Sequence, residues 1–279
     1  MLLTISTTHQ PASDLGYLLY KNPSQVQSFK LSCGEARVFY PENSDEKCTM
    51  ALVVDVDPIA LVRGRRDGQA LDQYVNDRPY CASSLLSVAI AQIFSSALSG
   101  KSRERPELAQ TAITLEASIA ALRCSSGEKF LRDLFEPLGY EVSAENHLLD
   151  EKFPQWGLSS YFTVSLKATK KLSELLNHLY VLIPVLDDQK HYWVGDDEVE
   201  KLLRHGKDWL AEHPLHKTIV KRYLLHYRSL ADEALSRLAD GGEIDVDEVE
   251  RQHATEEAAL ESRISLNEQR LHTTLTTCL

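Results

Sequence analysis

Two aspartates, Asp55 and Asp57, stand as DVD at the end of an apolar stretch, where carboxylates could bind a divalent cation. Divalent cations such as Mg²⁺ and Ca²⁺ favour oxygen ligands of this kind. No third candidate ligand lies near the pair in the sequence, and Pro58 follows Asp57 directly, which is typical of a turn. We therefore interpret the two residues as the end of a strand and not as a metal site.

A second set of possible ligands is a group of histidines in the last third of the chain. Zinc sites on helices use histidines spaced i and i+4 on one face, with a carboxylate as the base where the site is hydrolytic. Pro214 lies between His213 and His216 and prevents them from sharing a helix face. Helix caps and surface contacts are the better interpretation of this group, which comprises His191, His205, His213, His216 and His226.

Motifs of catalysis are missing from the sequence. It contains no G-x-G-x-x-G, no P-loop, no G-x-S-x-G and no H-E-x-x-H, and no set of Ser, His and Asp stands out. The five cysteines are isolated, without a C-x-x-C pair, as expected of reduced thiols that serve as small core residues in the cytoplasm. We therefore predict that the chain is not an enzyme and holds no cofactor or metal of its own.

Two basic clusters could contact phosphate groups or an acidic partner surface, although a solvated loop and a solvated helix face remain the alternative. The net charge of −11 argues against free-standing RNA binding as the main role. Residues 243–261 alone contribute −7 of this charge, with eight acidic residues and one basic residue. The candidate phosphate contacts are Arg63, Arg65, Arg66, Lys217, Lys221 and Arg222.

Two segments rich in aromatic and charged residues have the composition of protein-interface anchors, because Tyr, Trp and Arg combine a large contact area with specific donors. YVNDRPY occupies residues 74–80, and QKHYWVGDD occupies residues 189–197. Aromatic residues at the rim of a core remain the alternative for each segment. The candidate contacts with a partner protein are Tyr74, Asn76, Asp77, Arg78, Tyr80, His191, Tyr192, Trp193, Asp196 and Asp197.

The elements that must position these residues follow from the hydrophobic pattern, which alternates between strand and helix spacing. In the first part of the chain, this pattern predicts strands at 2–8, 29–40 and 48–56, a short helix after Asp14, and an apolar helix at 83–98. In the second part of the chain, the pattern predicts strands at 115–124, 140–149 and 161–168, a helix from Gly127, and an apolar helix at 172–186. The same order of elements thus occurs twice, and both apolar helices would be buried against the strands.

The predicted fold class is therefore α+β, with two β-α-β-β-α-like units at 1–110 and 111–195 that form a mixed or antiparallel sheet core. A helical segment at 196–240 packs on the core and includes a long amphipathic helix at 218–238. Residues 241–279 are predicted to be an acidic linker and the start of a further region that this chain lacks. No apolar stretch approaches about 20 residues, and no basic region precedes the first apolar residues, so we expect a soluble, cytoplasmic protein.

Several long blocks occur in order between Met1 and Leu238: TTHQPASDLGYLLYKNP, VVDVDPIALVRG, YVNDRPYCASSLLSVA, FLRDLFEPLGYEV and HLYVLIPVLDDQKHYWVGDDEVEKLLRHG. Together they closely resemble the N-terminal half of bacterial HEN-type 3′-terminal RNA ribose 2′-O-methyltransferases. In that family a catalytic half follows, with an S-adenosylmethionine site and a divalent metal site, and neither motif occurs here. The segment LNEQRL at 266–271 resembles the lead-in to that half.

The resemblance implies a non-catalytic domain that binds and activates the RNA ligase module of bacterial polynucleotide kinase-phosphatase in tRNA repair. It also implies that the chain is part of a hetero-oligomer, a heterotetramer, that binds RNA. The parent protein is then expected to 2′-O-methylate RNA 3′ ends with S-adenosylmethionine. One alternative is a direct RNA 3′-end binding module, which predicts RNA affinity that falls steeply with salt. Another is an unrecognised enzyme, which predicts an activity that depends on metal.

Overall fold

The computed structural model describes residues 1–31, 34–57, 84–187, 196–224 and 228–240 of the 279-residue chain. Seven strands form one sheet in the order β2-β3-β4-β1-β5-β7-β6, and neighbouring strands are antiparallel. This confirms the α+β fold class and identifies the sheet as antiparallel. The strands are β1 (Leu2–Thr7), β2 (Gln27–Leu31), β3 (Gly34–Asn43), β4 (Cys48–Val56), β5 (Ile113–Arg123), β6 (Glu141–Leu148) and β7 (Leu158–Lys170).

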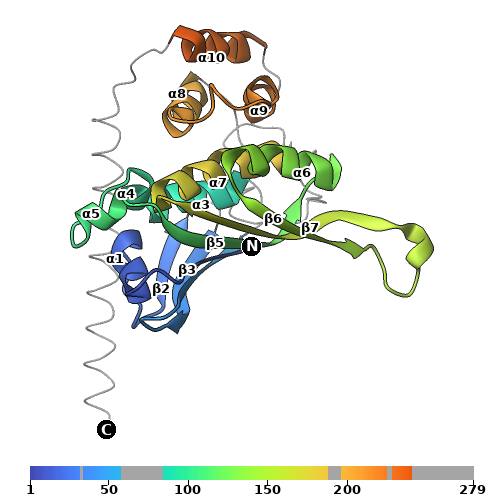
Figure 1. Ribbon diagram of the computed structural model, residues 1–279. Helices are drawn as coiled ribbons and strands as arrows, with labels where there is room; N and C mark the ends of the chain where they lie inside the picture. The colour runs from blue at the N-terminus through green and yellow to red at the C-terminus, as the bar shows by residue number, and fades with distance from the viewer. Residues whose placement is uncertain (32–33, 58–83, 188–195, 225–227, 241–279) are drawn as a thin grey trace.

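One face of the sheet forms the core, and alternation along the strands shows why. In β1, Leu3 and Ile5 are fully buried, whereas Thr4 and Ser6 are only partly buried, since successive side chains point to opposite faces. Helices α3 and α7 lie over the buried face and pack on each other (Figure 1). The helices of this layer are α3 (Ser84–Ile93), α4 (Ser95–Leu98), α6 (Gly127–Phe135) and α7 (Leu172–Asp187).

The two halves of the sheet are similar in part of their topology. β1 and β5 pair at its centre, and each is the first strand of its half. In each half the first strand pairs with the last, β1 with β4 and β5 with β7, and a long helix of the covering layer follows. The second half has the order of elements predicted from the sequence, whereas the first half has one strand more, and the boundary between two units at residue 110 stays a prediction.

The first half has one strand more than predicted. Within the single strand predicted at 29–40, residues 29–31 belong to β2 and residues 34–40 belong to β3, and the two strands pair with each other. Gly34 begins β3 with a φ of +145°, and a Cβ at this position would lie 2.1 Å from the carbonyl oxygen of Asp55. Because glycine alone adopts such a backbone readily, the close approach of β3 to β4 at its first residue depends on Gly34, and the apolar pattern that continues on both sides concealed the start of a new strand.

Two helices predicted as continuous are each divided. The helix predicted at 83–98 is interrupted at Phe94, whose φ and ψ are −121° and 34°. The helix predicted at 218–238 is interrupted at Leu224, whose φ and ψ are −91° and 19°, and its described parts are α9 (His216–Tyr223) and α10 (Arg228–Asp240). Phe94 and Leu224 are both fully buried. Packing in the core therefore overrides the local helical pattern at each break.

Helices α8 (Asp196–Gly206), α9 and α10 form a further layer, which we call the helical cap (Figure 1). α8 and α9 contact α7, and α10 contacts α8 and α9. No helix in the described part of the chain is long and apolar enough to span a membrane. Shorter elements are η1 (Ala12–Asp14), α1 (Leu15–Leu19), α5 (Pro106–Ala109), η2 (Glu136–Leu138) and η3 (Pro154–Trp156).

Candidate functional site

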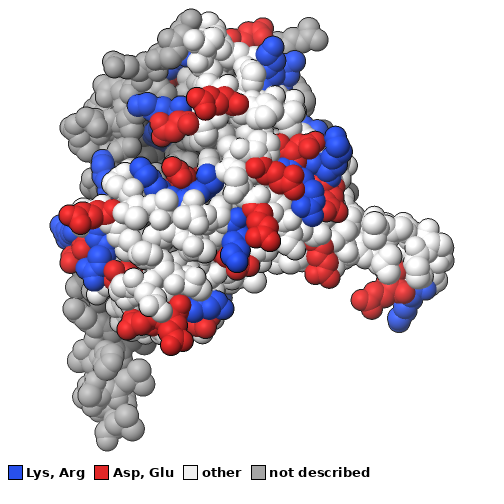
Figure 2. Space-filling view, in the orientation of Figure 1, with Lys and Arg blue, Asp and Glu red and all other residues white. Residues whose placement is uncertain are grey.

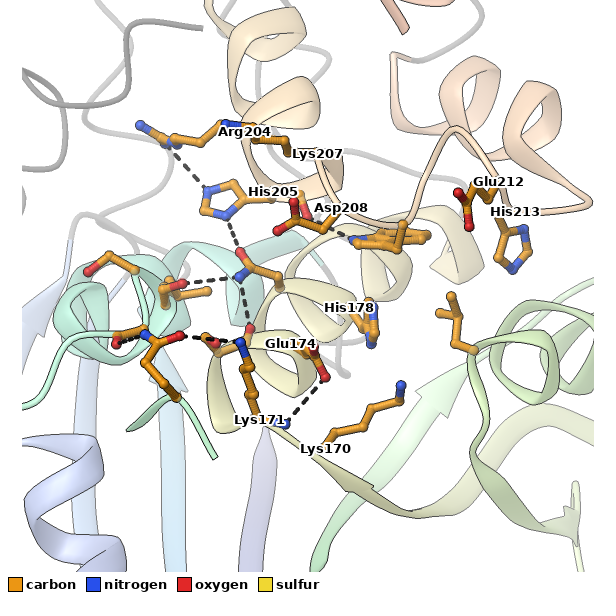
Figure 3. Close-up of a pocket in the computed structure, with 18 of the residues that line it drawn as sticks. Lys170, Lys171, Glu174, His178, Arg204, His205, Lys207, Asp208, Glu212 and His213 are labelled. Carbon is orange, nitrogen blue, oxygen red and sulfur yellow. Dashed lines mark hydrogen bonds between the residues drawn. The ribbon is translucent and has the colours of Figure 1, made fainter. Parts of the chain in front are cut away.

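A cleft of about 760 Å³ lies between the helical cap and the first turns of α7, and we refer to it as the polar cleft (Figure 3). One wall is α4 with the loop that follows it, including Ser99 and Lys101. The opposite wall is the end of α8 with the loop that leads to α9. The start of α7 lies between them, so three segments distant in sequence meet at this place.

Asn177 of α7 links these segments by hydrogen bonds. Its Nδ2 donates to the carbonyl oxygens of Leu98, at 3.1 Å, and Ser173, at 2.8 Å. Its Oδ1 therefore accepts a hydrogen bond, at 2.5 Å, from Nδ1 of His205, and Nε2 of His205 accepts one from Arg204 at 3.4 Å (Figure 3). The proton of His205 thus lies on Nδ1, and the network joins α8 to α7 and α4.

Two further imidazoles flank the Trp209 indole, with ring centroids 4.9 Å away for His178 and 6.0 Å away for His213. Nδ1 of His178 shares a 2.8 Å hydrogen bond with the Tyr140 hydroxyl, and burial lowers the pKa of His178 to about 3. Burial also lowers the pKa of His213, whose Nε2 donates to the carbonyl oxygen of Leu134 at 3.0 Å. Both rings are therefore neutral at pH 7.

The rim of the cleft has more cationic than anionic side chains. Nζ of Lys170 lies 5.5 Å from the centroid of the Tyr140 ring, and Nζ of Lys171 donates to Gln110 at 3.3 Å. Five cations and three anions make the cleft locally positive, although the chain has a net charge of −11. The charged residues of the lining are Lys101, Lys170, Lys171, Arg204 and Lys207, and Glu174, Asp208 and Glu212.

This arrangement suits the binding of an anion better than acid–base catalysis. A catalytic imidazole needs a pKa near the working pH and a ring nitrogen that can exchange a proton. His178 is too strongly desolvated, and His205 and His213 use both ring nitrogens in the hydrogen bonds that hold the fold. Within the described ranges, no group of three or more His, Cys, Asp and Glu side chains is placed to hold a metal ion.

The histidines noted in the sequence divide between the cleft and its surroundings. His205 and His213 line the cleft, and His216 donates from Nδ1 to the carbonyl oxygen of His213 at 3.0 Å. His205 and His213 are buried, so the surface contacts predicted for the group are wrong for these two, which form hydrogen bonds inside the fold. His191 and His226 lie outside the described residues.

The basic cluster of α9 does not line the cleft. Lys217 and Lys221 are exposed on α9. The Arg222 guanidinium lies 4.2 Å from the centroid of the Phe130 ring and donates to Oγ of Ser126 at 2.8 Å. Arg222 therefore joins α9 to the start of α6, and the phosphate-binding role of the three basic residues stays a prediction.

The other residues noted in the sequence lie at the ends of β4 and α8 or outside the described residues. Asp55 and Asp57 are exposed at and just after the end of β4. Asp196 and Asp197 begin α8, as the acidic first turn predicted for that helix. The contacts that lie outside the described residues are Arg63, Arg65, Arg66, Tyr74, Asn76, Asp77, Arg78, Tyr80, His191, Tyr192 and Trp193.

Asn177, His178 and Trp209 were not predicted from the sequence, although a signal exists for two of them. The α7 sequence LSELLNHLYVLIPVLD places Asn and His together inside an apolar helix. A polar side chain that is buried needs a hydrogen-bond partner, so such a pair indicates a buried network. The partners, Tyr140 and His205, are far away in sequence, and only the fold identifies them.

The fold and the cleft define an α+β module with one antiparallel sheet, a covering helix layer and a helical cap. Residues 1–239 match the family described as "RNA repair, ligase-Pnkp-associating, region of Hen1", and the chain belongs to this family. The family predicted by the resemblance is thus confirmed. Sequence comparison with curated proteins finds no match.

The fold is similar to that of a chain in the solved "Structure of the Pnkp1/Rnl/Hen1 RNA repair complex". The TM-score is 0.51 and the sequence identity is 13%, over 83% of this chain and 54% of that chain. This chain therefore spans about half the length of the solved one. At this identity the similarity shows the fold.

Proposed function

We propose that this chain is a non-catalytic module that binds the ligase module of a bacterial Pnkp and switches on its RNA ligase activity. The family match over residues 1–239 carries the proposal, because the family is described by its association with ligase and Pnkp. The fold similarity to a chain of an RNA repair complex supports it. On this proposal the chain works in the cytoplasm, in a hetero-oligomer that handles RNA, and its parent protein 2′-O-methylates RNA 3′ ends.

Activation by docking has a simple physical basis. A nucleotidyl-transferring ligase must hold ATP, metal and its lysine nucleophile in a near-attack arrangement, and poor positioning can cost orders of magnitude in rate. A rigid partner that orders a ligase segment would supply this positioning without adding catalytic groups. The continuous core from the sheet through α7 to the helical cap is a suitable rigid body.

The decisive experiment is the sealing of broken tRNA by the isolated ligase module of the cognate Pnkp, with and without this chain. We expect sealing only when the chain is added, with saturation near equal stoichiometry. A stable complex that seals nothing would reject activation and leave the chain as a tether. The double change Tyr74→Ala and Arg78→Ala tests the predicted YVNDRPY contact, and unchanged binding and sealing would remove this segment from the interface.

A second candidate function, direct RNA 3′-end binding, is favoured by the positive polar cleft. Lys170, Lys171, Arg204 and Lys207 could contact phosphates, and such binding weakens steeply with salt. Fluorescence anisotropy of 3′-labelled RNA measures this affinity. Measurements at about 50 and about 200 mM salt give its salt dependence. Changing Lys170 and Lys171 to Glu should abolish it, while Lys30→Glu, on an exposed strand position away from the cleft, should not.

A further inference from the structure

The β6–β7 hairpin ends in a segment, residues 148–158, that we call the apolar arm. It extends away from the body of the protein at the right of Figure 1. Of the nine large hydrophobic residues that are exposed in the described part of the chain, five lie in this segment. They are Leu148 (42% exposed), Leu149 (60%), Phe153 (42%), Trp156 (60%) and Leu158 (62%).

The arm has a defined shape before it meets any partner. Leu148 pairs with Leu158 across the hairpin, and the N–H of Leu149 donates to the carbonyl oxygen of Gly157 at 3.0 Å. The Phe153 and Trp156 rings are stacked, with centroids 4.7 Å apart and planes 15° from parallel. The arm would therefore lose little conformational freedom when a partner binds it, which favours affinity.

The exposed area is large enough to matter for association. With about 200 Å² for a fully exposed large side chain, the five residues present roughly 500 Å² to solvent. A stable interface buries about 800 Å² on each partner, so the arm would supply more than half of one side. Trp and other aromatic residues are also the side chains that most often dominate binding free energy.

We propose that the apolar arm inserts into an apolar groove of the ligase-bearing partner and is a main contact of that complex. The proposal rests on the proposed function, since the family is described by its association with ligase and Pnkp. Figure 2 shows the arm largely free of charge, apart from one mixed cluster on its lower side. The tip sequence Asp150-Glu151-Lys152 has two acids and one base, which predicts a basic rim on the groove. The same net negative tip disfavours an anionic lipid surface.

The test replaces Phe153 and Trp156 with Ser together and compares the variant with Val26→Ser. Val26 is 60% exposed and lies away from the arm, so it is a matched control for the loss of an exposed hydrophobic side chain. Binding of each chain to full-length cognate Pnkp is measured by calorimetry, and sealing is measured in parallel. We expect the double variant to bind at least about 100-fold more weakly and the control within about threefold of the wild type.

Several outcomes would overturn the proposal. If the wild-type chain binds and activates while the double variant does so equally well, the arm is not a main contact and the proposed function stands. If the wild-type chain does not bind Pnkp, the proposed function and this inference fall together. A wild-type chain that forms dimers which the double variant does not form would assign the arm to a second copy.

The melting temperature of the double variant is the control for folding. If it is unchanged, any loss of binding is not a loss of fold.

Discussion

The buried imidazole of His178 makes the stability of this protein sensitive to mild acid. Burial lowers its pKa to about 3 from an ordinary value of 6.5, and the positive charge of Lys170 acts in the same direction. As the pH falls below 6.5, the unfolded chain binds a proton that the folded protein does not accept. Stability that is fully present above pH 6.5 is therefore lost progressively down to about pH 3.

The size of the effect follows from the two pKa values. At pH 5.5 the unfolded state gains about 1.4 kcal/mol from protonation of this one residue, and at pH 7.5 it gains less than about 0.1 kcal/mol. Protonation in the folded state contributes almost nothing at either pH, because His178 is buried and its Nδ1 is paired with Tyr140. Between pH 7.5 and pH 5.5, the free energy of unfolding should thus fall by about 1.4 kcal/mol because of His178 alone.

The assay is urea unfolding followed by tryptophan fluorescence at pH 7.5, 6.5 and 5.5, for the wild type and for His178→Gln. Gln can still form a hydrogen bond with the Tyr140 hydroxyl but cannot titrate, so the variant should lose about 1.4 kcal/mol less between pH 7.5 and 5.5. His147→Gln, which changes an exposed imidazole, is the control. Equal losses in the wild type and in His178→Gln, or a folded-state NMR titration of His178 near pH 6, would refute the reasoning.

Three further predictions concern single positions. Asn177→Ala removes the hydrogen bonds that join α4, α7 and α8 and should cost about 2 kcal/mol in chemical denaturation; a loss below about 0.5 kcal/mol would show that the network is dispensable. Gly34→Ala places a Cβ against the backbone of β4 and should lower stability by at least about 2 kcal/mol, whereas Gly139→Ala, with open space around it, should cost about 1 kcal/mol; similar losses would contradict this. Burial raises the pKa of the Cys48 thiol to about 11, so iodoacetamide at pH 8 should modify it only after unfolding, and rapid modification of the native protein, seen by peptide mapping, would show that the thiol is accessible.

Elements with a strong local pattern were predicted well. The strand at 48–56 and the apolar helix at 172–186 lie within one residue of β4 and α7. The family was also predicted from ordered sequence blocks, and residues 1–239 match it. Errors arose at Gly34, Phe94 and Leu224, where the backbone of one residue departs from regular strand or helix geometry inside a continuing apolar pattern. Periodicity reports which side chains are buried, and it does not report where the backbone turns between them.

The candidate site was less accessible to sequence reasoning. The polar cleft depends on contacts between residues that are distant in sequence, such as Tyr140 with His178 and Asn177 with His205. The apolar arm illustrates the opposite difficulty. Phe153 and Trp156 have the composition of core residues, and only their position on a projecting hairpin makes them exposed.

The sequence by itself determined the α+β class, most strands and helices, and the family of this protein, because each depends on local spacing or on ordered blocks of residues. The tertiary structure alone decided the order of strands in the sheet, the neutral state of His178, the positive cleft under the helical cap and the exposure of the arm. The physical reason is that burial, charge balance and hydrogen-bond pairing are properties of groups brought together across the whole chain, and no local pattern records which groups will meet.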